Sequence, residues 1–464
     1  MTPRRNERSR GSIYLGVAAG LFAVSGALAG GYVVTGGSEP AGIGPAAASE
    51  HEPAGAADLG AGLGAAVGGA LDMTVTVKAG GQERVLRWSE LGVVVDADEL
   101  PHAARKASGG DALAALRGLG ALPVRLDRAK ALDAITHLKA TIDRAPTDAY
   151  LDLEARAIHD DKPGFAIDVF ASLDRIEAAA RSGAAEVELA SVPLPARVTK
   201  AGLGIDDISH VLGHFRTTFA VADKDRNFNL KLAASKLNGY VLEPGVEFSF
   251  NAVVGDRTEK EGYKIAHVIT KGEMVDGLAG GTCQISTTLF GASFFAGIDI
   301  TKTTPHSRPS TYVPLGMDST VVWPNVDLKM KNPYDFPVVI HYRVARGEAV
   351  VEILGKKRPW DKIAFEREVL EETPFQSEKR EDEGLPIGVQ TYDQEGFPGY
   401  KLTRFRKFYR NGKVVKTDKW KVEYKPVTEY VRVGTNLDPL AAVPDVKPHH
   451  GPKKPGNGNG RIEQ

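Results

Sequence analysis

The stretch Ala279–Phe290, AGGTCQISTTLF, contains the one cysteine of the 464-residue chain, Cys283. Two glycines precede this cysteine, and glycine adopts the backbone conformations of a tight turn without steric cost. After the cysteine, apolar residues recur at helical spacing until Gly297, which is a natural helix stop. The pattern therefore predicts a glycine turn that leads into a helix with Cys283 at or near its N-terminus.

That position favours a reactive thiol. Unpaired backbone N–H groups and the helix dipole favour negative charge at a helix N-terminus. Such positions lower a cysteine pKa from about 8.5 toward neutrality or below. A lone cysteine has no intramolecular disulfide partner, so Cys283 is a nucleophile, an intermolecular link or a buried, inert thiol. We expect a nucleophile.

The composition is that of an ordinary soluble globular protein, with 42% hydrophobic and 25% charged residues. A net charge of −1 provides no long-range field for nucleic acid, which disfavours that class of partner. The folded part shows no phosphate-binding loop, nucleotide fingerprint or clustered metal ligands. We therefore expect neither a cofactor nor a bound metal.

The N-terminus predicts export from the cytoplasm. Arginines within the first ten residues precede an uncharged run, Gly11–Ser38, whose apolar part is Ile13–Val34. This part is long enough to cross a bilayer, and the arginines would keep the N-terminus in the cytoplasm. A cleaved signal peptide is the alternative, because Ala27–Ala29 forms a small-x-small cleavage site. We favour an uncleaved anchor because the apolar run continues past that site, and both alternatives place the body of the protein outside the cytoplasm.

The rest of the chain predicts a multidomain α+β protein. Composition and hydrophobic periodicity separate a membrane segment, a linker, three folded modules and a tail. These are an anchor or signal peptide (1–34), a flexible Gly/Ala linker (35–71), a small α+β module (72–200), a mixed α/β domain with the Cys283 helix (201–360), a small β-rich module (361–440) and a disordered tail (441–464).

Four segments of the mixed domain closely resemble the VanW family. They are TTFAVADKDRNFNLKLAASKLNGYVLEPGVEFSFN (Thr217–Asn251), VGDRTEKEGY (Val254–Tyr263), GGTCQISTTLF (Gly280–Phe290) and PHSRPSTYVPLGMDSTV (Pro305–Val321). More loosely, 143–198 is similar to the peptidoglycan-binding module that often precedes VanW domains. The segment KVEYKPVTEYVRVGT (Lys421–Thr435) looks like the end of a G5 module.

The resemblance implies work in the cell envelope on peptidoglycan or its precursors. Some VanW-domain proteins are proposed to be L,D-transpeptidases that use a cysteine to form 3-3 peptide crosslinks. One departure concerns the turn: the family usually shows three glycines before the x-Cys pair, and here Ala279 replaces the first.

Thiol transpeptidation needs a proton acceptor as well as a thiolate. His306 is the preferred base, because a histidine with an ordinary pKa near 6.5 can take a thiol proton and return it to a leaving amine. His267 is the rival. It shares a predicted strand face with Tyr263, Ile265 and Ile269, which also fits a core histidine.

Several polar residues are candidates for support of the reaction. The backbone N–H of Cys283, with that of a neighbour, can form an oxyanion site. Gln284 either adds an amide donor or braces the turn, and Ser307 can orient His306. Asp318 and the nearby Asp327 either hold the histidine or cap a turn.

Arg257 is a candidate clamp for a substrate carboxylate, because a guanidinium binds carboxylates through two parallel hydrogen bonds. A structural ion pair with Glu259 or Glu261 is the alternative.

Together these observations predict a membrane-anchored envelope enzyme, a cysteine acyltransferase that acts on peptidoglycan stem peptides. Two alternatives stay open. One is a non-catalytic peptidoglycan-binding or scaffold protein in which Cys283 is buried, and the other is a thiol peptidase that trims stem peptides.

Overall fold

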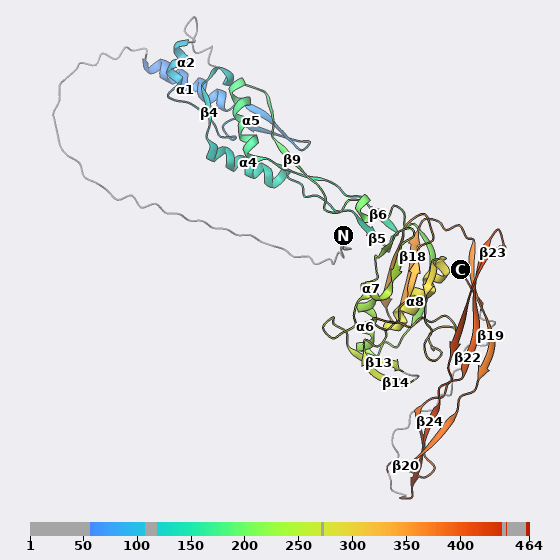
Figure 1. The fold of residues 1–464 in the computed structure, drawn as a ribbon. Helices are drawn as coiled ribbons and strands as arrows, with labels where there is room; N and C mark the ends of the chain where they lie inside the picture. The colour runs from blue at the N-terminus through green and yellow to red at the C-terminus, as the bar shows by residue number, and fades with distance from the viewer. Residues whose placement is uncertain (1–55, 107–117, 271–272, 439–441, 443–460) are drawn as a thin grey trace, which may run out of the picture. The chain divides into compact units, whose positions relative to one another are not determined.

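The computed structural model describes residues 56–106, 118–270, 273–438, 442 and 461–464. The chain divides into two units, 1–61 and 62–464, and the second unit contains the folded modules (Figure 1). The predicted membrane segment Ile13–Val34 lies outside the described residues. Within the described residues, no helix has both the length and the apolar character needed to cross a membrane.

The first module is α+β. Strand β1 pairs antiparallel with β2 and parallel with β8, and helices α4 and α5 pack against each other beside them. The carboxylates of Asp127 and Asp168 cap α4 and α5 by accepting backbone N–H bonds. The elements are α1 (Ala56–Leu71), β1 (Thr74–Ala79), β2 (Gln82–Arg87), β3 (Val93–Val95), α2 (Leu100–Lys106), η1 (Leu119–Ala121), β4 (Val124–Leu126), α4 (Arg128–Ile142), β5 (Tyr150–Asp152), β6 (Ala157–His159), β7 (Gly164–Ile167), α5 (Val169–Ser182), β8 (Glu186–Glu188) and β9 (Ser191–Leu194).

The predicted flexible linker, 35–71, is shorter than expected, because its last part forms α1. Ala70 of this helix is buried in the module core, and Val67 and Leu71 pack against the same core, which includes Trp88. Alanine is the best helix former, and burial of one apolar face stabilises a helix that is marginal in isolation. The small side chains of this Gly/Ala-rich segment therefore did not prevent its last part from folding.

The central domain is built on a four-stranded sheet in the order β10-β18-β17-β11. Figure 1 shows α8 lying beside this sheet, and α8 contacts both β10 and β18. The elements are η2 (Ala201–Leu203), β10 (His210–Thr218), α6 (Lys224–Ser235), β11 (Val241–Leu242), β12 (Glu247–Ser249), α7 (Phe250–Val254), β13 (Ile265–Thr270), β14 (Glu273–Leu278), α8 (Thr282–Ala296), β15 (Asp299–Lys302), β16 (Lys329–Lys331), β17 (Val338–Ala345) and β18 (Glu348–Gly355).

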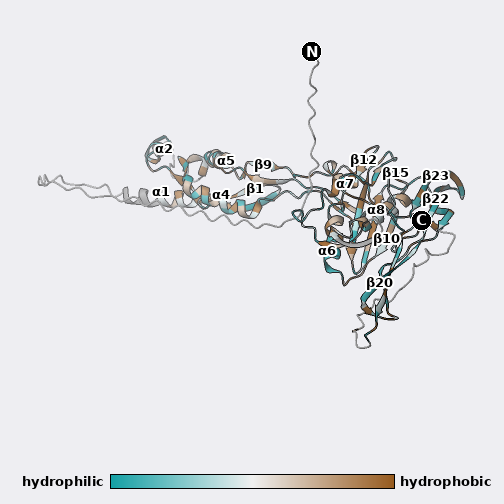
Figure 2. Cartoon of the chain, turned by 60° about the horizontal axis from the view of Figure 1, so that its bottom comes forward, coloured by the Kyte–Doolittle hydropathy of each residue, from teal (hydrophilic) through white to brown (hydrophobic). Residues whose placement is uncertain are grey.

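Helix α8 is the central element of the core. Every residue of α8 except Cys283 is buried, and its hydrophobic residues are visible in Figure 2. The helix backbone lies directly on the sheet at Gly213 of β10, where an added Cβ would come within 2.2 Å of the Ala296 backbone nitrogen. A helix buried on all sides has its ends fixed by packing. The position of Cys283 is therefore set by the core.

The C-terminal region is all β and forms two sheets, ordered β23-β22-β19-β25 and β20-β24-β21. Its elements are β19 (Lys362–Thr373), β20 (Ser377–Pro386), β21 (Gln390–Gln394), β22 (Gly399–Arg410), β23 (Lys413–Tyr424), β24 (Glu429–Asn436) and β25 (Ile462–Glu463). Ile363, Phe365 and Phe408 of this region belong to the same buried core as α8. The predicted boundary at 360/361 therefore passes through a shared core.

The chain end departs from the predicted disordered tail, 441–464. Residues 443–460 lie outside the described part, but β25 pairs with β19. The backbone of Gln464 exchanges two hydrogen bonds with Ile363, and the Gln464 side chain bonds to the backbone of His214. Strand pairing along an open edge satisfies the backbone groups of these last residues.

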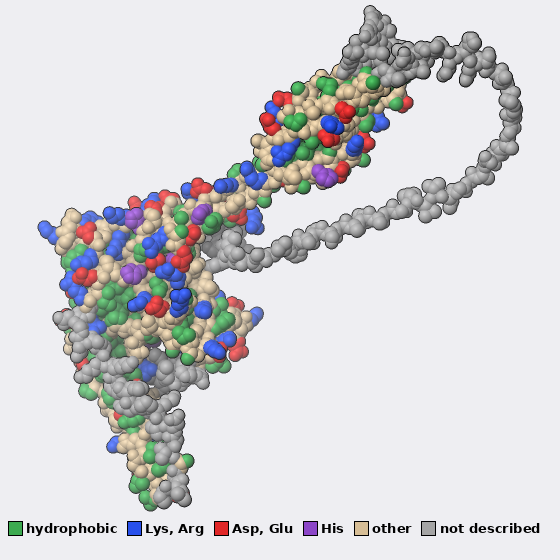
Figure 3. All heavy atoms as spheres, turned by 180° about the vertical axis from the view of Figure 1, so that it is seen from behind, with side chains coloured by type: hydrophobic (Ala, Val, Ile, Leu, Met, Phe, Trp, Pro, Cys, Tyr) green, Lys and Arg blue, Asp and Glu red, His purple; other side chains and the backbone are tan. Residues whose placement is uncertain are grey.

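These elements confirm a multidomain α+β protein with a small C-terminal all-β region. On the face drawn in Figure 3, side chains of both charge signs are mixed over the surface that the structure describes. This distribution agrees with the net charge of −1.

Candidate functional site

The turn before α8 presents Cys283 to solvent. Ala279 and Gly281 both adopt positive φ angles, 61° and 105°. Ala279 thus takes the left-handed conformation that the missing glycine would have supplied, at a cost of roughly 1–2 kcal/mol. Cys283 is the second residue of α8 and is partly exposed, whereas its neighbours Thr282 and Gln284 are buried.

The helix end offers one backbone donor at the thiol. The N–H of Thr282 donates to the Ala279 carbonyl (3.2 Å), and the N–H of Gln284 donates to the Gly281 carbonyl (2.9 Å). Among these first three N–H groups of α8, that of Cys283 is left for a ligand. A developing negative charge beside Cys283 would meet this group and the positive end of the helix dipole.

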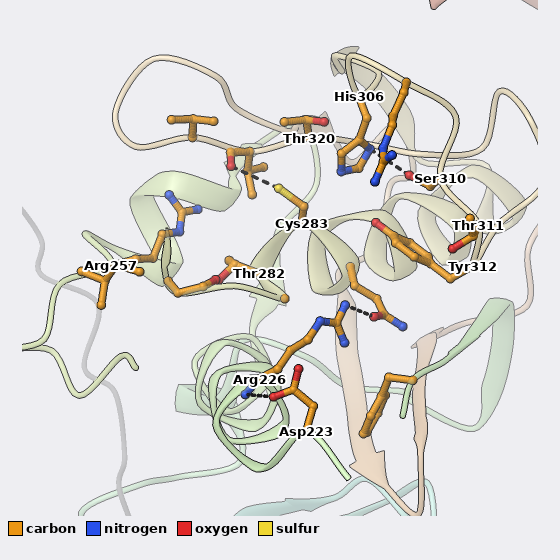
Figure 4. Close-up of a pocket in the computed structure, with 18 of the residues that line it drawn as sticks. Asp223, Arg226, Arg257, Thr282, Cys283, His306, Ser310, Thr311, Tyr312 and Thr320 are labelled. Atoms are coloured by element: carbon orange, nitrogen blue, oxygen red, sulfur yellow. Dashed lines mark hydrogen bonds between the residues drawn. The ribbon is translucent and has the colours of Figure 1, made fainter. Parts of the chain in front are cut away.

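Cys283 and His306 both line the pocket (Figure 4), and Asp318, behind His306, completes a Cys-His-Asp constellation. The Nδ1 atom of His306 lies 2.7 Å from Oδ2 of Asp318, and the same oxygen accepts the His306 backbone N–H at 2.7 Å. Both side chains are buried. With Nδ1 held by the carboxylate, Nε2 is the ring nitrogen left to interact with Cys283, whose thiol donates to the Val321 carbonyl (Sγ–O 3.4 Å).

Asp318 is fixed to the same helix that carries the thiol. The hydroxyls of Ser286 and Thr287 donate to the carbonyl of Ser319 at 2.6 and 3.1 Å, and the Ser319 N–H donates to Thr287 at 3.0 Å. The second carboxylate oxygen of Asp318 accepts a short hydrogen bond from the hydroxyl of Tyr424 in β23. One rigid helix therefore sets the spacing between Cys283 and Asp318.

The pKa shifts of Cys283 and His306 both favour the charged forms of these two groups. Burial alone would raise the pKa of Cys283, but the hydrogen bond and charge of His306 lower it, and the charge of Arg257 helps. Burial alone would lower the pKa of His306, but hydrogen bonds to Asp318 and Cys283 and their charges raise it to about 10. Burial would raise the pKa of Asp318, whereas its hydrogen bonds with His306 and Tyr424 hold it below the ordinary value.

The thiol faces a pocket of about 670 Å³. Arg226, Arg257 and Arg308 all line it, and within the described residues none of the three forms an ion pair with a carboxylate. Burial lowers the pKa of each of these guanidinium groups, although their ordinary pKa is so high that they stay charged. Asp223 and Asp256 also line the pocket, so its three arginines outnumber its carboxylates, which suits an anionic ligand.

Arg257 has two buried donors without a protein partner among the described residues. Its Nη2 donates to the Asn251 side chain at 2.7 Å, while Nε and Nη1 are buried without a partner among the described residues. The alternative for Arg257, an ion pair with Glu259 or Glu261, does not form among the described residues; Glu261 contacts Lys236 at 3.6 Å instead. Buried donors without partners are costly, so a ligand that accepts from Arg257 would gain that energy back.

The structure separates the roles that the sequence left open. The amide nitrogen of Gln284 donates to Thr217 Oγ1 and the Thr218 carbonyl, both at 2.9 Å, so the Gln284 side chain ties α8 to the end of β10. Ser307 is exposed, and the hydroxyl that lies against Nδ1 of His306 is that of Ser310, at 3.1 Å.

Asp327 lies away from His306 and caps α7, where it accepts bonds from the Ser249 hydroxyl (2.6 Å) and the Asn251 N–H (2.9 Å). His267, the rival base, lies in β13 opposite Asp276, and its side chain lies outside the described part. The role of His267 as the alternative base stays a prediction.

Four site residues escaped the sequence analysis: Arg226, Ser310, Tyr312 and Tyr424. Arg226 donates to Oε1 of Gln284 at 2.7 Å, and the Tyr312 ring packs edge-on to His306. Ser310 and Tyr312 lie in the segment Pro305–Val321 beside His306, and this closeness in sequence is the signal that marks them. Tyr424 follows Asp318 by 106 residues in another module, and no local pattern marks it.

Comparisons with known proteins match all three modules. The model of a "VanW like protein" matches residues 225–354, a peptidoglycan-binding domain model matches 99–188, and a G5 domain model matches 366–436. The constellation and the pocket arginines lie within or beside the first of these matches.

Curated relatives resemble part of the chain. The Bacillus subtilis "Uncharacterized protein YoaR" is 40% identical over 142 residues, which is 31% of this chain and 47% of that protein. The Enterococcus faecalis "Vancomycin B-type resistance protein VanW" is 28% identical over 144 residues, which is 30% of this chain and 52% of that protein. The chain thus spans about half the length of these relatives. A solved structure, "IgA1 Protease G5 domain structure", is 26% identical and covers 16% of this chain and 90% of that one, with a TM-score of 0.12.

The domain matches indicate a cell-wall-associated protein, in which a domain with a Cys-His-Asp constellation follows a match to a peptidoglycan-binding domain and precedes a β-rich module. Such modules indicate a location outside the cytoplasm. The chain contains a VanW-like domain, with matches to a peptidoglycan-binding domain and a G5 domain on either side of it in the sequence.

Proposed function

We propose that this protein is a thiol acyltransferase that joins peptidoglycan stem peptides, an L,D-transpeptidase-like activity. The observation that carries the proposal is the Cys283–His306–Asp318 constellation at the edge of an arginine-lined pocket. A partly exposed thiol with a lowered pKa, a buried imidazole and a buried carboxylate supply a nucleophile, an acid–base group and its orienting partner.

The first half-reaction acylates the enzyme. The Cys283 thiolate attacks the carbonyl carbon of a donor peptide bond, and the N–H of Cys283 donates to the oxyanion that forms. The imidazolium of His306 then gives its Nε2 proton to the leaving amine. The C–N bond breaks, the terminal D-amino acid departs, and a thioester remains on Cys283.

The second half-reaction returns the enzyme to its starting state. The amine of a neighbouring stem peptide attacks the thioester carbonyl, and the neutral His306 takes one proton from that amine. The C–S bond breaks, which restores the thiolate and the imidazolium and leaves a new peptide bond between the two stems. The cycle requires no cofactor.

The parts of the chain before the VanW-like domain would place the enzyme near its substrate. We infer that the N-terminal module holds the enzyme on the cell wall, which raises the local concentration of stem peptides. The segment Ile13–Val34 is the proposed membrane anchor, and a cleaved signal peptide remains the alternative.

Product analysis tests the proposed function. Purified protein is incubated with disaccharide tetrapeptides, and the products are separated by mass. We expect crosslinked dimers and released D-amino acid, and neither product with Cys283→Ala. Trimmed monomers without dimers would instead indicate a thiol peptidase. No product at all, with a folded protein, would favour the non-catalytic alternative.

Arg257 is the proposed contact for a substrate carboxylate. We expect Arg257→Met to reduce kcat/KM for a donor with a free carboxylate by about 10- to 100-fold, the effect of losing one charge-assisted hydrogen-bond pair. The measurement is the rate of D-amino acid release from this donor and from its carboxamide analogue. Arg216→Met is the matched control, because Arg216 forms an exposed ion pair with Glu348. An equal loss for the carboxamide donor would contradict the assignment.

A further inference from the structure

The loop that carries Asp318 is held by the C-terminal β region. The N–H of Gly316 donates to the Tyr424 hydroxyl at 3.0 Å, and that hydroxyl in turn donates to Asp318. Arg404 of β22 donates to the Gly316 carbonyl at 2.9 Å, and Arg367 of β19 donates to the Leu315 carbonyl at 3.2 Å. Three adjacent strands of one sheet thus bind the backbone of this loop.

Side-chain packing also holds the loop of Asp318 against the C-terminal sheet. Leu315 is buried in a small hydrophobic cluster whose other members all come from β22 and β23, and these are Tyr400, Leu402, Val422 and Tyr424. The Arg404 guanidinium is buried beneath the loop and lies over the rings of Phe290 in α8 and Trp420 in β23. The loop is therefore clamped between α8 and the C-terminal sheet.

We propose that the C-terminal β region is part of the reaction apparatus, with Tyr424 as a positioning residue that fixes Asp318 against His306. Tyr424 is 2% exposed and reaches no substrate, so it acts through the carboxylate. Its hydroxyl occupies one oxygen of Asp318, which leaves the other oxygen for the two hydrogen bonds with His306. Both carboxylate oxygens are then fixed by partners on opposite sides, and the carboxylate cannot rotate.

The inference rests on the proposed function only in taking Cys283 as the reactive group. Besides its own members His306 and Asp318, the charged and titratable groups that surround the constellation are Tyr424, Arg404, Arg257, Arg226 and Tyr312. Of these, the Tyr424 hydroxyl is the group by which the C-terminal sheet hydrogen-bonds to the carboxylate itself.

The test is the pH dependence of Cys283 alkylation by iodoacetamide in the full-length protein. We expect Tyr424→Phe, which keeps the ring and removes the hydroxyl, to move the midpoint of the alkylation curve upward by about one pH unit. Without the Tyr424 hydroxyl, the Asp318 carboxylate can rotate away from His306 and then stabilises the imidazolium less well. The free energy of one hydrogen bond to a charged group corresponds to a pKa change of about one unit. Tyr400→Phe is the matched control, because Tyr400 lies directly opposite Tyr424 in the sheet, within the same cluster.

A shifted midpoint in Tyr424→Phe with an unchanged midpoint in Tyr400→Phe supports the proposal. An unchanged midpoint in Tyr424→Phe, or the same shift in both variants, overturns it. Should Tyr424→Phe not fold, Leu315→Ala loosens the same loop by packing alone and is judged by the same criteria. Because alkylation needs no peptide substrate, this result is independent of the product analysis that tests acyl transfer.

Discussion

Replacing His306 by glutamine is expected to slow alkylation of Cys283 at pH 6 by roughly 30- to 100-fold. The physical reason is the loss of the imidazolium, which lowers the pKa of the thiol by its hydrogen bond and charge. Without it, burial raises that pKa, and only the Val321 backbone and the charge of Arg257 still oppose burial. A thiol with the ordinary pKa of about 8.5 is ionised to roughly 0.3% at pH 6, and the greater nucleophilicity of a more basic thiolate offsets part of the loss.

The sign of the pH dependence follows from the two shifts. In the native protein the thiol pKa is lowered and the His306 pKa is raised to about 10, so the ion pair persists between those two values. In His306→Gln, reactivity should appear only as the pH rises toward 9 and above. The two proteins should therefore differ most at low pH and converge near pH 10.

The matched control is His341→Gln. His341 is also a buried histidine with acidic partners, at 3.3 Å from both Glu154 and Glu352, but it lies in β17 and does not line the pocket. Its replacement should leave the alkylation curve in place. A native curve in His306→Gln would show that His306 does not set the ionisation of Cys283.

Replacing Asp318 by asparagine is expected to reduce acyl transfer at pH 7 by about 10²- to 10⁴-fold, the range seen when the carboxylate of a catalytic triad is neutralised. The amide removes the negative charge that raises the His306 pKa. An amide nitrogen turned toward Nδ1 would also place a donor against a donor and select the wrong tautomer. The measurements are the rate of dimer formation and the alkylation curve.

Alkylation of Asp318→Asn should recover at high pH, where the thiol ionises without help, whereas acyl transfer should stay low because proton transfer still needs an oriented imidazole. Asp327→Asn is the control. Asp327 is equally buried but caps α7 through Ser249 and Asn251, so its replacement should lower the melting temperature and leave the alkylation midpoint unchanged. A shift of equal size in Asp327→Asn would assign the effect to general destabilisation.

Local sequence predicted the elements well where the signal was short-range. The glycine turn before Cys283 and the stop at Gly297 are both decided by residues within a few positions of one another. Predictions based on composition were less accurate, since 35–71 ends in a buried helix and the chain end pairs with β19. In both cases the missing information was a distant partner that buries or pairs the segment.

The sequence alone determined that the chain has one thiol, at the start of an apolar helix within a VanW-like domain, with a histidine nearby in the motif Pro305–Val321. Only the tertiary structure decided which groups meet that thiol. Asp318 and Asp327 look equivalent in the sequence, yet the hydrogen bonds from α8 to Ser319 bring one to His306, while the start of α7 engages the other. Tyr424 reaches the site from another module because the C-terminal sheet shares its core with α8, and contacts between segments so far apart leave no periodic signal along the chain.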